Sequence, residues 1–406
     1  MRILYIQQHF ATNRGEAGVR GYQLVKTLAD RGHEVTVVCG ENWRDSALRA
    51  RPRGRSIDLD GFEVVQLPVF YSNHQTFSSR LASFLRFALL ACREVSRREA
   101  DLIFASSTPL TVSIPALWGR AIHRRPYVLE VRDLWPDLPV AMGIIRNPVL
   151  KRALFAWEAM AYRFAAGHVA LAPGIREGIA RRTSVSPDRV IMIPNGADTL
   201  GIRPERRNGR SLLRVPEEAL VLGYTGTHGA ANGLDAVLDA AAALQRRGVD
   251  GVVFALIGDG REKERLVQRA DDEGLDSVRF FDLVDKATYA LLLSELDVGM
   301  QILQNVSDFY WGTSPNKFFD YLAAGKPVLV NYPGWVSELV TEARCGVVVP
   351  PEDREAFADA VESLLHRREE LPAMGFRARA LAEERFSQQE ILHELAEWLE
   401  HEVALA

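Results

Sequence analysis

The residues between positions 313 and 327 combine hydroxyl, cationic and acidic side chains at a spacing that suits a phosphorylated ligand. Thr313 and Ser314 stand at an expected helix start, where their hydroxyls and free backbone N–H groups can hold a diphosphate. Lys317 adds positive charge. Asp320 lies one helical turn further on the same face, and its carboxylate can accept two hydrogen bonds from a ribose diol. The alternative is a capped helix with a surface Lys–Asp pair.

Two glycine turns in the second half of the chain follow apolar runs that read as strands. The first contains Thr227 and His228 between Gly226 and Gly229, and the second is the run 258–260, Gly-Asp-Gly. A glycine turn between a strand and a helix presents backbone N–H groups to an anion. The first turn therefore suits a phosphate, and the second is a tight turn between a strand end and a charged helix start.

A glycine-bearing loop also follows the first apolar run of the chain. Its spacing, with glycines at positions 15, 18 and 21, is not the dinucleotide fingerprint. The second apolar run ends in Cys39-Gly40 and lacks the acidic residue that a nicotinamide cofactor requires. A nicotinamide cofactor is disfavoured, and a turn without a ligand remains the alternative for these glycines.

Three charged residues stand near the end of another apolar run in the first half. Glu130, Arg132 and Asp133 lie where a strand should reach a ligand crevice. Charged groups at such a place are costly unless they are paired or functional. A catalytic role is favoured over the alternative, a structural Arg–Asp pair.

The elements that must position these residues are short apolar runs separated by helical stretches. Such alternation predicts a parallel, doubly wound sheet, with ligands beyond the carboxyl ends of its strands. The predicted strands are 3–6, 35–38, 64–67, 102–105, 128–131, 169–171 and 190–193, then 221–224, 252–257, 278–281, 298–302, 328–330 and 347–349. The polar, arginine-rich stretch around Pro204 separates the two series. We therefore predict an α/β chain of two Rossmann-like domains, 1–203 and 204–385, followed by a C-terminal helix, 386–406, that can pack back on the first domain.

Length and composition fit this division. The chain has 406 residues, of which 47% are hydrophobic and 25% are charged, as in globular proteins. Residues 1–203 hold 28 basic and 18 acidic side chains, whereas the rest holds 21 basic and 35 acidic ones. The three cysteines lack metal-ligand spacing, and no apolar run approaches the roughly 18 residues of a membrane span. These features predict a cytoplasmic protein.

A stretch of the basic first half places apolar residues at helical spacing between arginines. The apolar members are Phe77, Leu81, Phe84, Leu85 and Leu89, and the basic ones are Arg80, Arg86, Arg93, Arg97 and Arg98. A second such stretch contains Lys151, Arg152, Phe155 and Trp157. Basic amphipathic segments suit the surface of an anionic membrane. The alternative is an apolar face in the core with solvated arginines.

Taken together, these segments resemble glycosyltransferase family 4, the retaining enzymes with the GT-B fold, over nearly the whole chain. Within the family, the chain is most similar to bacterial surface-polysaccharide transferases such as the N-acetylfucosamine transferase-like branch. The segments that carry the resemblance are 15–18, Arg-Asp-Leu-Trp-Pro at 132–136, Pro-Asn-Gly-Ala-Asp at 194–198, 258–260, and Phe-Asp-Tyr-Leu-Ala-Ala-Gly-Lys-Pro at 319–327.

The resemblance implies two doubly wound domains that face a central cleft, and it assigns residues to roles. Asp320 matches the ribose-binding acidic residue, and Arg132-Asp133 stands where many members have His-Asp. The predicted donor-binding residues are Gly15, Gly18, Thr227, His228, Gly258, Arg261, Leu283, Val284, Thr313, Ser314, Asn316 and Asp320. The predicted catalytic residues are Asp133, Arg132, Glu130 and Lys317.

The chain departs from the family at the diphosphate. Many members carry an Arg and a Lys in the run that corresponds to residues 226–233, and both are absent here. Many also carry a Glu eight residues before the ribose-binding carboxylate, where this chain has Gly312. Lys317, with the Thr313-Ser314 helix start, is the expected substitute for the missing charge.

The resemblance implies a retaining hexosyl- or N-acetylhexosaminyl-transferase of cell-surface polysaccharide biosynthesis. The donor is expected to be a UDP-sugar, and the acceptor a glycan or a polyprenyl-diphosphate-linked sugar at the inner face of the membrane. No cofactor, metal or nucleic acid is expected, and the acidic run 58–60 is read as a turn. A nucleotide-sugar 2-epimerase of the same fold and a non-catalytic glycan-binding relative are the alternatives.

Overall fold

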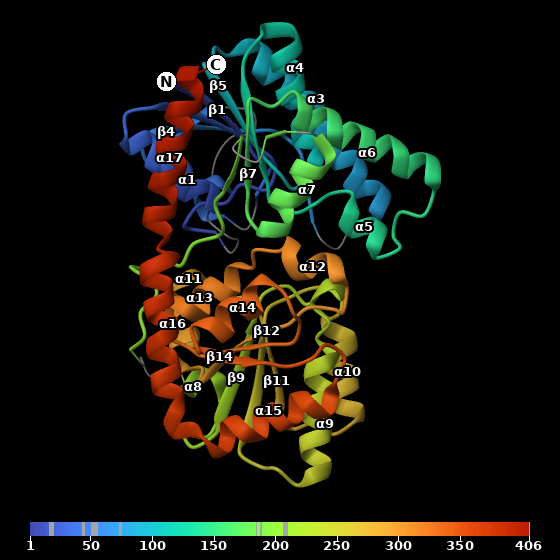
Figure 1. The fold of residues 1–406 in the computed structure, drawn as a ribbon, viewed down its shortest axis with the longest axis vertical. Coiled ribbons are helices and arrows are strands. Elements are labelled where there is room, and N and C mark those ends of the chain that lie inside the picture. Colours follow the sequence, from blue (N-terminus) through green and yellow to red (C-terminus); the bar gives the residue numbers. More distant parts are fainter. Residues whose placement is uncertain are drawn as a thin grey trace. The chain divides into compact units, whose positions relative to one another are not determined.

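The chain forms two compact α/β units in a computed structural model, which describes residues 1–15, 20–42, 45–49, 56–72, 75–183, 185–186, 189–205 and 210–405 (Figure 1). The first unit comprises Met1–Pro194, Trp311–Ser314 and Glu390–Ala406. The second comprises Asn195–Tyr310 and Pro315–Gln389. Each unit contains one sheet flanked by helices.

The first unit is built on an eight-stranded sheet with the order β3-β4-β2-β1-β5-β6-β7-β8. All neighbouring pairs are parallel except β3 and β4. Every residue of β5 and β6 is buried, as expected for parallel strands covered on both faces. The strands are β1 Arg2–Ile6, β2 Glu34–Cys39, β3 Ser56–Leu59, β4 Phe62–Gln66, β5 Leu102–Ser106, β6 Tyr127–Val131, β7 Gly167–Ala170 and β8 Val190–Met192.

The helices of the first unit cover this sheet. They are α1 Arg20–Asp30, α2 Ser46–Arg49, α3 Phe77–Arg97, the short helix η1 Leu110–Val112, α4 Ser113–His123, α5 Asp137–Ala141, α6 Pro148–Arg163 and α7 Pro173–Thr183. The N-terminal ends of α3 and α6 are fixed by caps: Thr76 accepts from Ser79 N–H, and Asn147 accepts from Val149 N–H and Leu150 N–H.

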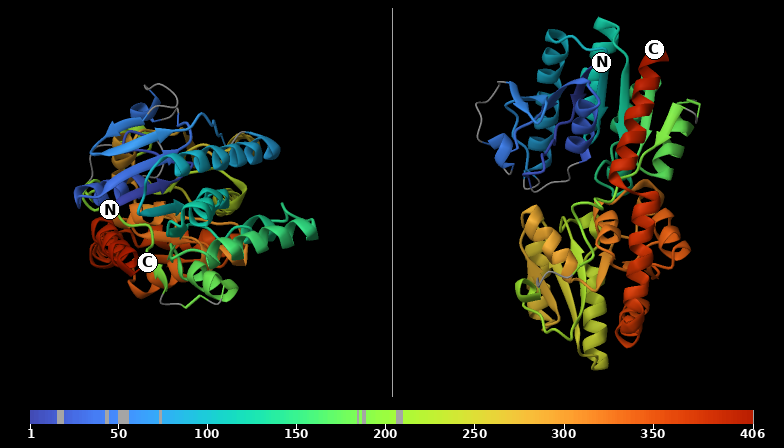
Figure 2. Two further views of the ribbon diagram at one scale, coloured as in Figure 1. Left: turned by 90° about the horizontal axis from the view of Figure 1, so that it is seen from above. Right: turned by 90° about the vertical axis from the view of Figure 1, so that its left-hand side faces the viewer.

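The last helix, α17 (Gln388–Leu405), joins the first unit from Glu390 onward. It lies beside the helix and strands at the start of the chain (Figure 2). Glu400 accepts hydrogen bonds from Arg31 Nη2 at 2.7 Å and lies 2.8 Å from His33 Nε2. The end of the chain is therefore held against its beginning.

The second unit is built on a six-stranded parallel sheet with the order β11-β10-β9-β12-β13-β14. Its strands are β9 Leu220–Thr225, β10 Val252–Ile257, β11 Val278–Phe281, β12 Val298–Gln301, β13 Val328–Val330 and β14 Gly346–Val348. Its helices are α8 Arg210–Leu213, η3 Ala230–Asn232, α9 Asp235–Arg247, α10 Lys263–Asp272, α11 Lys286–Glu295, α13 Asn316–Ala323, α14 Trp335–Glu342, α15 Arg354–His366, η4 Arg368–Glu370 and α16 Leu371–Arg385. The helix α12 Ser307–Gly312 begins in the second unit, and its last two residues are assigned to the first.

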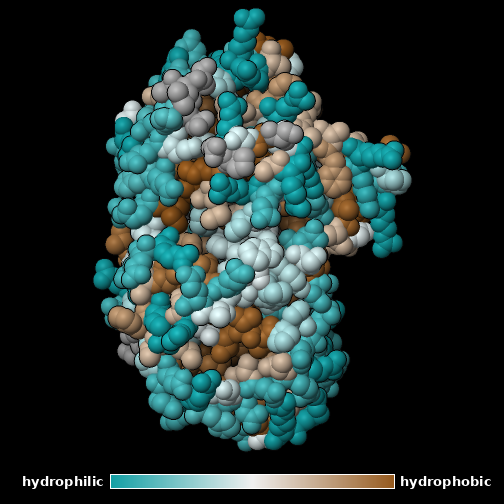
Figure 3. Space-filling view, in the orientation of Figure 1, coloured by the Kyte–Doolittle hydropathy of each residue, from teal (hydrophilic) through white to brown (hydrophobic). Residues whose placement is uncertain are grey.

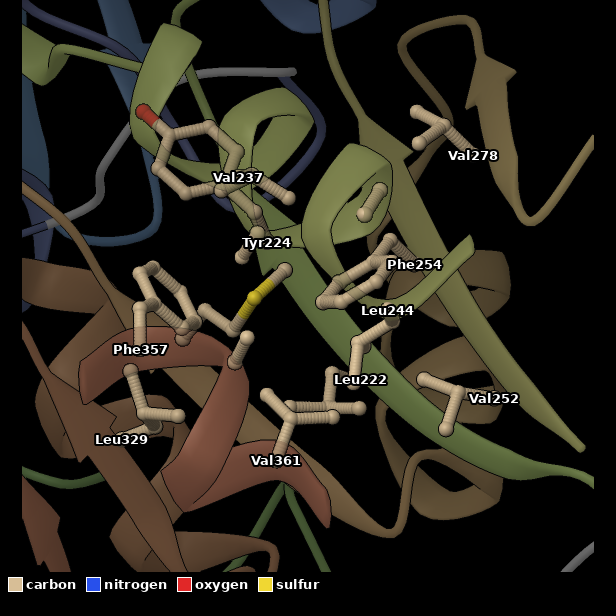
Figure 4. Packing of buried hydrophobic residues seen from close by; sticks show 14 of the residues in the cluster. Leu222, Tyr224, Val237, Leu244, Val252, Phe254, Val278, Leu329, Phe357 and Val361 are labelled. Atoms are coloured by element: carbon tan, nitrogen blue, oxygen red, sulfur yellow. The ribbon is translucent and has the colours of Figure 1, made fainter. Parts of the chain in front are cut away.

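The core of the second unit packs α9 and α15 against one face of the sheet. Leu222 and Phe254 from the strands meet Val237 from α9, with Phe357 and Val361 from α15 (Figure 4). Tyr224 belongs to this core by its ring, but its hydroxyl points away from the other labelled side chains (Figure 4). This hydroxyl therefore reaches the carboxyl end of the sheet.

The strand predictions are confirmed for all thirteen predicted strands, within two residues at each end. One strand, β3, was not predicted, because residues 58–60 were read as a turn. Only Asp60 (φ 51°) and Gly61 (φ 91°) form the turn, and Asp58 is paired with Glu63 across an antiparallel hairpin. The sequence feature that indicates β3 is the alternation of the apolar residues Ile57 and Leu59 with polar neighbours, which has the two-residue period of a strand with one exposed face.

Among the described residues, no helix combines the length and the apolar character that crossing a membrane requires. The same part of the chain holds no group of three or more His, Cys, Asp or Glu side chains placed to bind a metal ion.

Candidate active site

The carboxyl end of the second sheet carries the acidic residue that the sequence singled out. Asp320 lies on α13, which starts at Asn316 after an extended Pro315 (ψ 122°). Its Oδ2 accepts a hydrogen bond from the Tyr289 hydroxyl at 2.8 Å. The Tyr289 hydroxyl also lies 3.2 Å from Thr225 Oγ1, at the end of β9. Burial raises the pKa of Asp320 to about 6, so the carboxylate is held in a poorly solvated place.

Lys317 lies one turn earlier on α13 and turns toward the end of β9. Its Nζ donates to the Tyr224 hydroxyl at 2.8 Å and lies 4.0 Å from the centre of that ring. A Cβ added to Gly226 would be 3.3 Å from the same Nζ. The ammonium group is thus placed against the first glycine turn. Burial lowers the pKa of Lys317 to about 7, although the Asp320 charge opposes this shift.

A second lysine lies near Asp320. Lys286, at the start of α11, is half-buried. Burial lowers its pKa, and the carboxylates of Asp198 and Asp320 oppose that shift. The site therefore brings two cationic and two acidic side chains together from segments far apart in the sequence.

The two glycine turns of the second unit touch one another. A Cβ on Gly258 (φ 148°) would lie 1.9 Å from the Gly226 carbonyl oxygen, and one on Gly260 (φ 158°) would lie 2.4 Å from that of His228. No other residue fits either position, because both the φ angle and the space exclude a side chain. Lys263 Nζ donates to the carbonyls of Gly258 and Phe281 at 2.9 Å each, which fixes the second turn.

His228, in the first glycine turn, has a fully buried ring. Neither ring nitrogen has a hydrogen-bond partner among the described residues. Burial, with the charges of Lys263 and Lys317, lowers its pKa to about 4, so the imidazole is neutral near pH 7. A neutral ring can donate from one nitrogen and accept at the other.

The other predicted donor-side residues take different places. Thr227 and Asn316 are exposed, as are Arg261 and Leu283, whereas Val284 is half-buried. Thr313 and Ser314 directly precede Pro315, the residue before the start of α13, and both are half-buried. Gly18 lies outside the described residues.

In the first unit, Gly15 follows β1 in a turn that closes on Asp45. A Cβ on Gly15 would lie 2.8 Å from Asp45 Oδ2, so a larger residue would push this carboxylate away. The Thr12 hydroxyl donates to Asp45 Oδ1 at 2.9 Å, which holds the carboxylate in place. The close approach of Asp45 is therefore sufficient to explain why residue 15 is a glycine, and no ligand has to be invoked.

Glu130, at the end of β6, is occupied by partners within the first unit. Arg20 Nε donates to one carboxylate oxygen at 2.9 Å, and the Ser106 hydroxyl donates to the other. The Arg20 guanidinium also donates to the carbonyls of Pro194 (2.6 Å) and Ile193 (3.0 Å). Burial raises the pKa of Glu130, but the charges of Arg20 and Arg132 outweigh it, and the pKa lies below its usual value. This geometry favours a structural role for Glu130, in a pair with Arg20 that the sequence analysis did not consider.

Arg132 and Asp133 follow β6 and are half-buried. The backbone N–H of Arg132 donates to Ser107 Oγ at 3.0 Å, which ties this turn to the end of β5. Burial raises the pKa of Asp133, against the opposing charge of Arg132. Both residues therefore directly follow the carboxyl end of β6.

Several residues of these sites carried no signal in the sequence. Tyr289, Thr225, Tyr224 and Lys286 contact Asp320 or Lys317 only through the fold. A tyrosine in an ordinary helix is not distinguishable from a core residue, and nothing in the sequence around Tyr289 marks it.

Two family models match the chain in succession. Residues 15–196 match the glycosyl transferase 4-like domain, and residues 219–367 match the glycosyl transferases group 1. Together they cover most of both units. The chain is a family 4 glycosyltransferase.

Two similar proteins cover nearly the whole and about half of this glycosyltransferase. The protein named colanic acid biosynthesis glycosyl transferase WcaI, from Escherichia coli strain K12, is 26% identical over 424 residues, covering 97% of this chain and 98% of that protein. D-inositol 3-phosphate glycosyltransferase from Saccharomonospora viridis is 30% identical over 227 residues, covering 52% of this chain and 49% of that protein.

Solved structures show the same fold. Sucrose-phosphate synthase from Thermosynechococcus elongatus superimposes with a TM-score of 0.77 at 16% identity, over the whole of both chains. Anabaena Alr3699/HepE in complex with UDP and glucose gives 0.72 at 19% identity, covering 99% of this chain and 100% of that one. The predicted GT-B fold, family and enzyme class of this glycosyltransferase are therefore confirmed.

Proposed function

We propose that this glycosyltransferase transfers a sugar from a UDP-sugar to a glycan or lipid-linked acceptor, with retention at the anomeric carbon, in polysaccharide biosynthesis. The observation that carries the proposal is the pair formed by Asp320 and Lys317 at the carboxyl end of the second sheet. One is a carboxylate held by a tyrosine hydroxyl, and the other is an ammonium placed against a glycine turn.

The donor binds in the second unit under this proposal. Asp320 accepts hydrogen bonds from the ribose diol, and Tyr289 holds the carboxylate in the orientation that this requires. Lys317 supplies the charge for the diphosphate, together with backbone N–H groups of the Gly226–Gly229 turn. The base lies beside Leu283 and Val284. Support for uridine comes from the similar Anabaena protein, whose structure contains UDP.

Catalysis then rests on positioning and charge stabilisation. The acceptor oxygen forms a bond to the anomeric carbon while the bond from that carbon to the diphosphate oxygen breaks, on the same face of the sugar. The departing diphosphate takes the proton of the acceptor hydroxyl, so no enzyme nucleophile is consumed. Lys317 stabilises the charge that develops on the leaving group. Arg132 and Asp133 orient the acceptor side. No cofactor or metal ion is needed in this scheme.

The acceptor is proposed to be attached to a lipid, because of a surface on α3 and α4 that we call the α3–α4 face. It exposes Leu81, Leu85 and Leu89 of α3 with Trp118 and Ile122 of α4, the most exposed being Leu89 (70%) and Ile122 (57%). The two helices pack together, and Ser96 Oγ accepts from Trp118 Nε1 at 2.9 Å. Apolar surface near α4 is visible in Figure 3.

The positive charge around the α3–α4 face favours an anionic partner. No acidic residue occurs between positions 102 and 129, whereas Arg120, Arg124 and Arg125 do. Arg86, Arg93 and Arg97 flank the leucines on α3 and are exposed. Exposed apolar side chains among arginines bind anionic lipid headgroups and the acyl boundary beneath them. We propose peripheral binding to an anionic bilayer at the cytoplasmic face of the membrane.

Co-sedimentation with vesicles tests this part of the proposal. The protein should sediment with phosphatidylglycerol-containing vesicles more than with phosphatidylcholine vesicles, and Leu85→Ser with Leu89→Ser should reduce that binding. The matched control is Leu200→Ser, an exposed leucine of the second unit. Equal sedimentation of the double variant and the control would contradict the membrane surface.

A nucleotide-sugar 2-epimerase would need acid–base carboxylates, and Glu130 and Asp133 were the candidates. Since both oxygens of Glu130 are engaged by Arg20 and Ser106, only Asp133 is left for that role. The geometry therefore supports transfer more than epimerisation.

The donor proposal is tested by thermal stabilisation with UDP-, GDP-, dTDP- and ADP-sugars. Binding raises stability with the excess of ligand over its dissociation constant. A shift with UDP-sugars that disappears in Asp320→Ala would support the proposal, followed by product analysis by NMR for the anomeric configuration. The absence of a shift with every nucleotide would reject it and favour a non-catalytic glycan-binding protein.

A further inference from the structure

One face of α7 contacts the segment after β6 at two points. Gly178 and Arg182 are four residues apart on this helix and therefore lie on the same face. A Cβ added to Gly178 would lie 2.9 Å from both Leu134 Cδ atoms, so this leucine packs directly on the helix backbone. Arg182 Nη2 donates to Asp137 Oδ1 at the end of the same segment. Residues 132–137 are thus held to α7.

Arg182 joins this segment to a third helix. Its Nη1 donates to Glu158 Oε2 on α6, and the Tyr162 hydroxyl, one turn further on α6, donates to Glu158 Oε1 at 2.8 Å. The guanidinium carbon lies 4.7 Å from the centre of the Phe155 ring, which holds its position further. One guanidinium group therefore ties α5, α6 and α7 together (Figure 1). We call Asp137, Glu158 and Arg182 the Arg182 cluster.

The charges of the Arg182 cluster do not balance. Two carboxylates share one guanidinium group, so the cluster carries a net charge of −1 when both carboxylates are ionised. The Glu158 side chain is fully buried, and Asp137 Oδ2 is buried without a hydrogen-bond partner among the described residues. An unbalanced charge in such a place is costly, and the uptake of one proton by a carboxylate removes that cost.

The groups that face Glu158 come from the elements packed around it. Burial raises the pKa of Glu158 to about 7. The Asp137 charge adds to this rise, whereas the Arg182 charge and the Tyr162 hydroxyl oppose it. His168 on β7 meets the Tyr162 ring edge-on at 5.8 Å, and burial lowers the pKa of His168 to about 4, so this imidazole is neutral near pH 7. The other ionisable side chains of α4, α6 and α7 are exposed or half-buried: Arg120, His123, Lys151, Arg152, Arg163, Arg176, Glu177 and Arg181.

The short helix α5 is the least firmly held part of this arrangement. It has five residues, none of which is fully buried, and the Asp137 side chain is 18% exposed. When the cluster loses its proton, movement of Asp137 into water relieves the excess charge, since Glu158 would have to leave the core. Loss of the proton therefore loosens α5 and the end of the segment 132–137.

We propose that the Arg182 cluster is a proton-dependent clamp, which holds the segment 132–137 against α7 and loosens it as the pH rises above neutrality. Arg132 and Asp133 lie in this segment, so the clamp determines how firmly they are positioned. The clamp rests on the proposed function, in which these two residues orient the acceptor side, and adds its regulation by pH. Arg182 is a positioning residue in this scheme, because it acts through the segment.

Fluorine NMR of the protein labelled with 5-fluorotryptophan tests the clamp, because Trp135 lies within the segment. The Trp135 resonance, assigned with Trp135→Phe, should shift between about pH 5.5 and 8.5, with its midpoint near the Glu158 pKa of about 7. The Trp335 resonance, from the second unit, should not follow this curve. In Glu158→Gln, which removes the excess charge and keeps an oxygen that accepts from Arg182, the shift of Trp135 should disappear.

Asp137→Asn is a second variant, in case Glu158→Gln fails to fold. It removes a charge that raises the Glu158 pKa, so the Trp135 midpoint should move to lower pH by roughly one unit or more. Glu177→Gln removes an exposed carboxylate from α7 and is the matched control, with the midpoint of the wild type.

The inference is overturned if the Trp135 resonance does not shift over this pH range, or if it shifts equally in the wild type and in Glu158→Gln. UDP-glucose binding is measured on the same samples. Its absence would reject the donor proposal, whereas a Trp135 titration that depends on Glu158 would still support the clamp.

Discussion

The charged side chains of Glu130 in the first unit and of the Asp320–Lys317 pair in the second have their hydrogen-bonding capacity filled to very different degrees. In the first unit, Arg20 and Glu130 form an ion pair in which both carboxylate oxygens and three guanidinium nitrogens have partners. In the second unit, Asp320 has one tyrosine hydroxyl and Lys317 has another. The pKa of Glu130 lies below its usual value, whereas burial raises that of Asp320 to about 6.

This contrast distinguishes charged side chains that stabilise the fold from charged side chains that are available to bind a ligand. A charge whose hydrogen-bonding capacity is filled by the protein has none left for a ligand. A charge with a shifted pKa and unfilled capacity costs stability and can recover that cost when a ligand arrives. This contrast supports a structural role for Glu130 in the first unit and the proposed donor-binding role of Lys317 and Asp320.

The largest effect is expected from breaking the structural pair. Glu130→Ala leaves the Arg20 guanidinium buried without its carboxylate, and the free energy of unfolding should fall by about 3–5 kcal/mol. Urea denaturation measures this loss. The double replacement Arg20→Leu with Glu130→Leu should recover part of it, and a single variant as stable as the wild type would contradict the structural role.

The next largest effect is expected at Lys317. Removing the charge in Lys317→Met should lower kcat by a factor of about 100, since one leaving-group contact of this kind contributes about 3 kcal/mol. Because burial lowers the pKa of Lys317 to about 7, its charged form destabilises the fold, so the variant should be at least as stable as the wild type below pH 7. Steady-state kinetics and thermal melting measure the two changes. A variant that is less stable than the wild type and has a normal kcat would show that Lys317 is a structural charge and not a donor-binding one.

The pH dependence of donor binding sharpens the same point. The Asp320 carboxylate is charged above its pKa of about 6, and the Lys317 ammonium is charged below its pKa of about 7. Affinity for UDP-glucose should therefore be highest between about pH 6 and 7 and fall on both sides. Isothermal titration calorimetry across this range measures it. In Lys317→Met, the affinity for UDP-glucose should no longer fall above pH 7. If the affinity still falls there as in the wild type, the decline comes from the titration of another group.

The smallest effect is expected at the residue that positions Asp320. Tyr289→Phe removes one hydroxyl that donates to the carboxylate, at a cost of about 1 kcal/mol or roughly fivefold in donor affinity. Thermal stabilisation by UDP-glucose gives the change. A comparison with Tyr310→Phe, a tyrosine that stacks on Tyr332, separates the loss of this hydroxyl from a general tyrosine effect.

Much of the fold could be predicted because parallel strands are continuous apolar runs. Asp320 and Lys317 could be predicted because both lie in one short segment with a repeating helical spacing. Tyr289 and Tyr224 could not, since they reach these residues across 31 and 93 positions of sequence, and only the sheet brings them together. The partners of Glu130 come from equally distant segments, so the sequence could not separate a structural carboxylate from a catalytic one. The roles of Arg132, Asp133 and the donor-side residues stay predictions.

One measurement tests the central claim most directly: calorimetric titration of UDP-glucose into the wild type, Lys317→Met, Asp320→Asn and Glu130→Gln at pH 6.5. The account predicts binding by the wild type, binding weakened at least tenfold in the Lys317 and Asp320 variants, and nearly normal binding by the folded Glu130 variant. Normal binding in Lys317→Met and Asp320→Asn, with loss in Glu130→Gln, would contradict it.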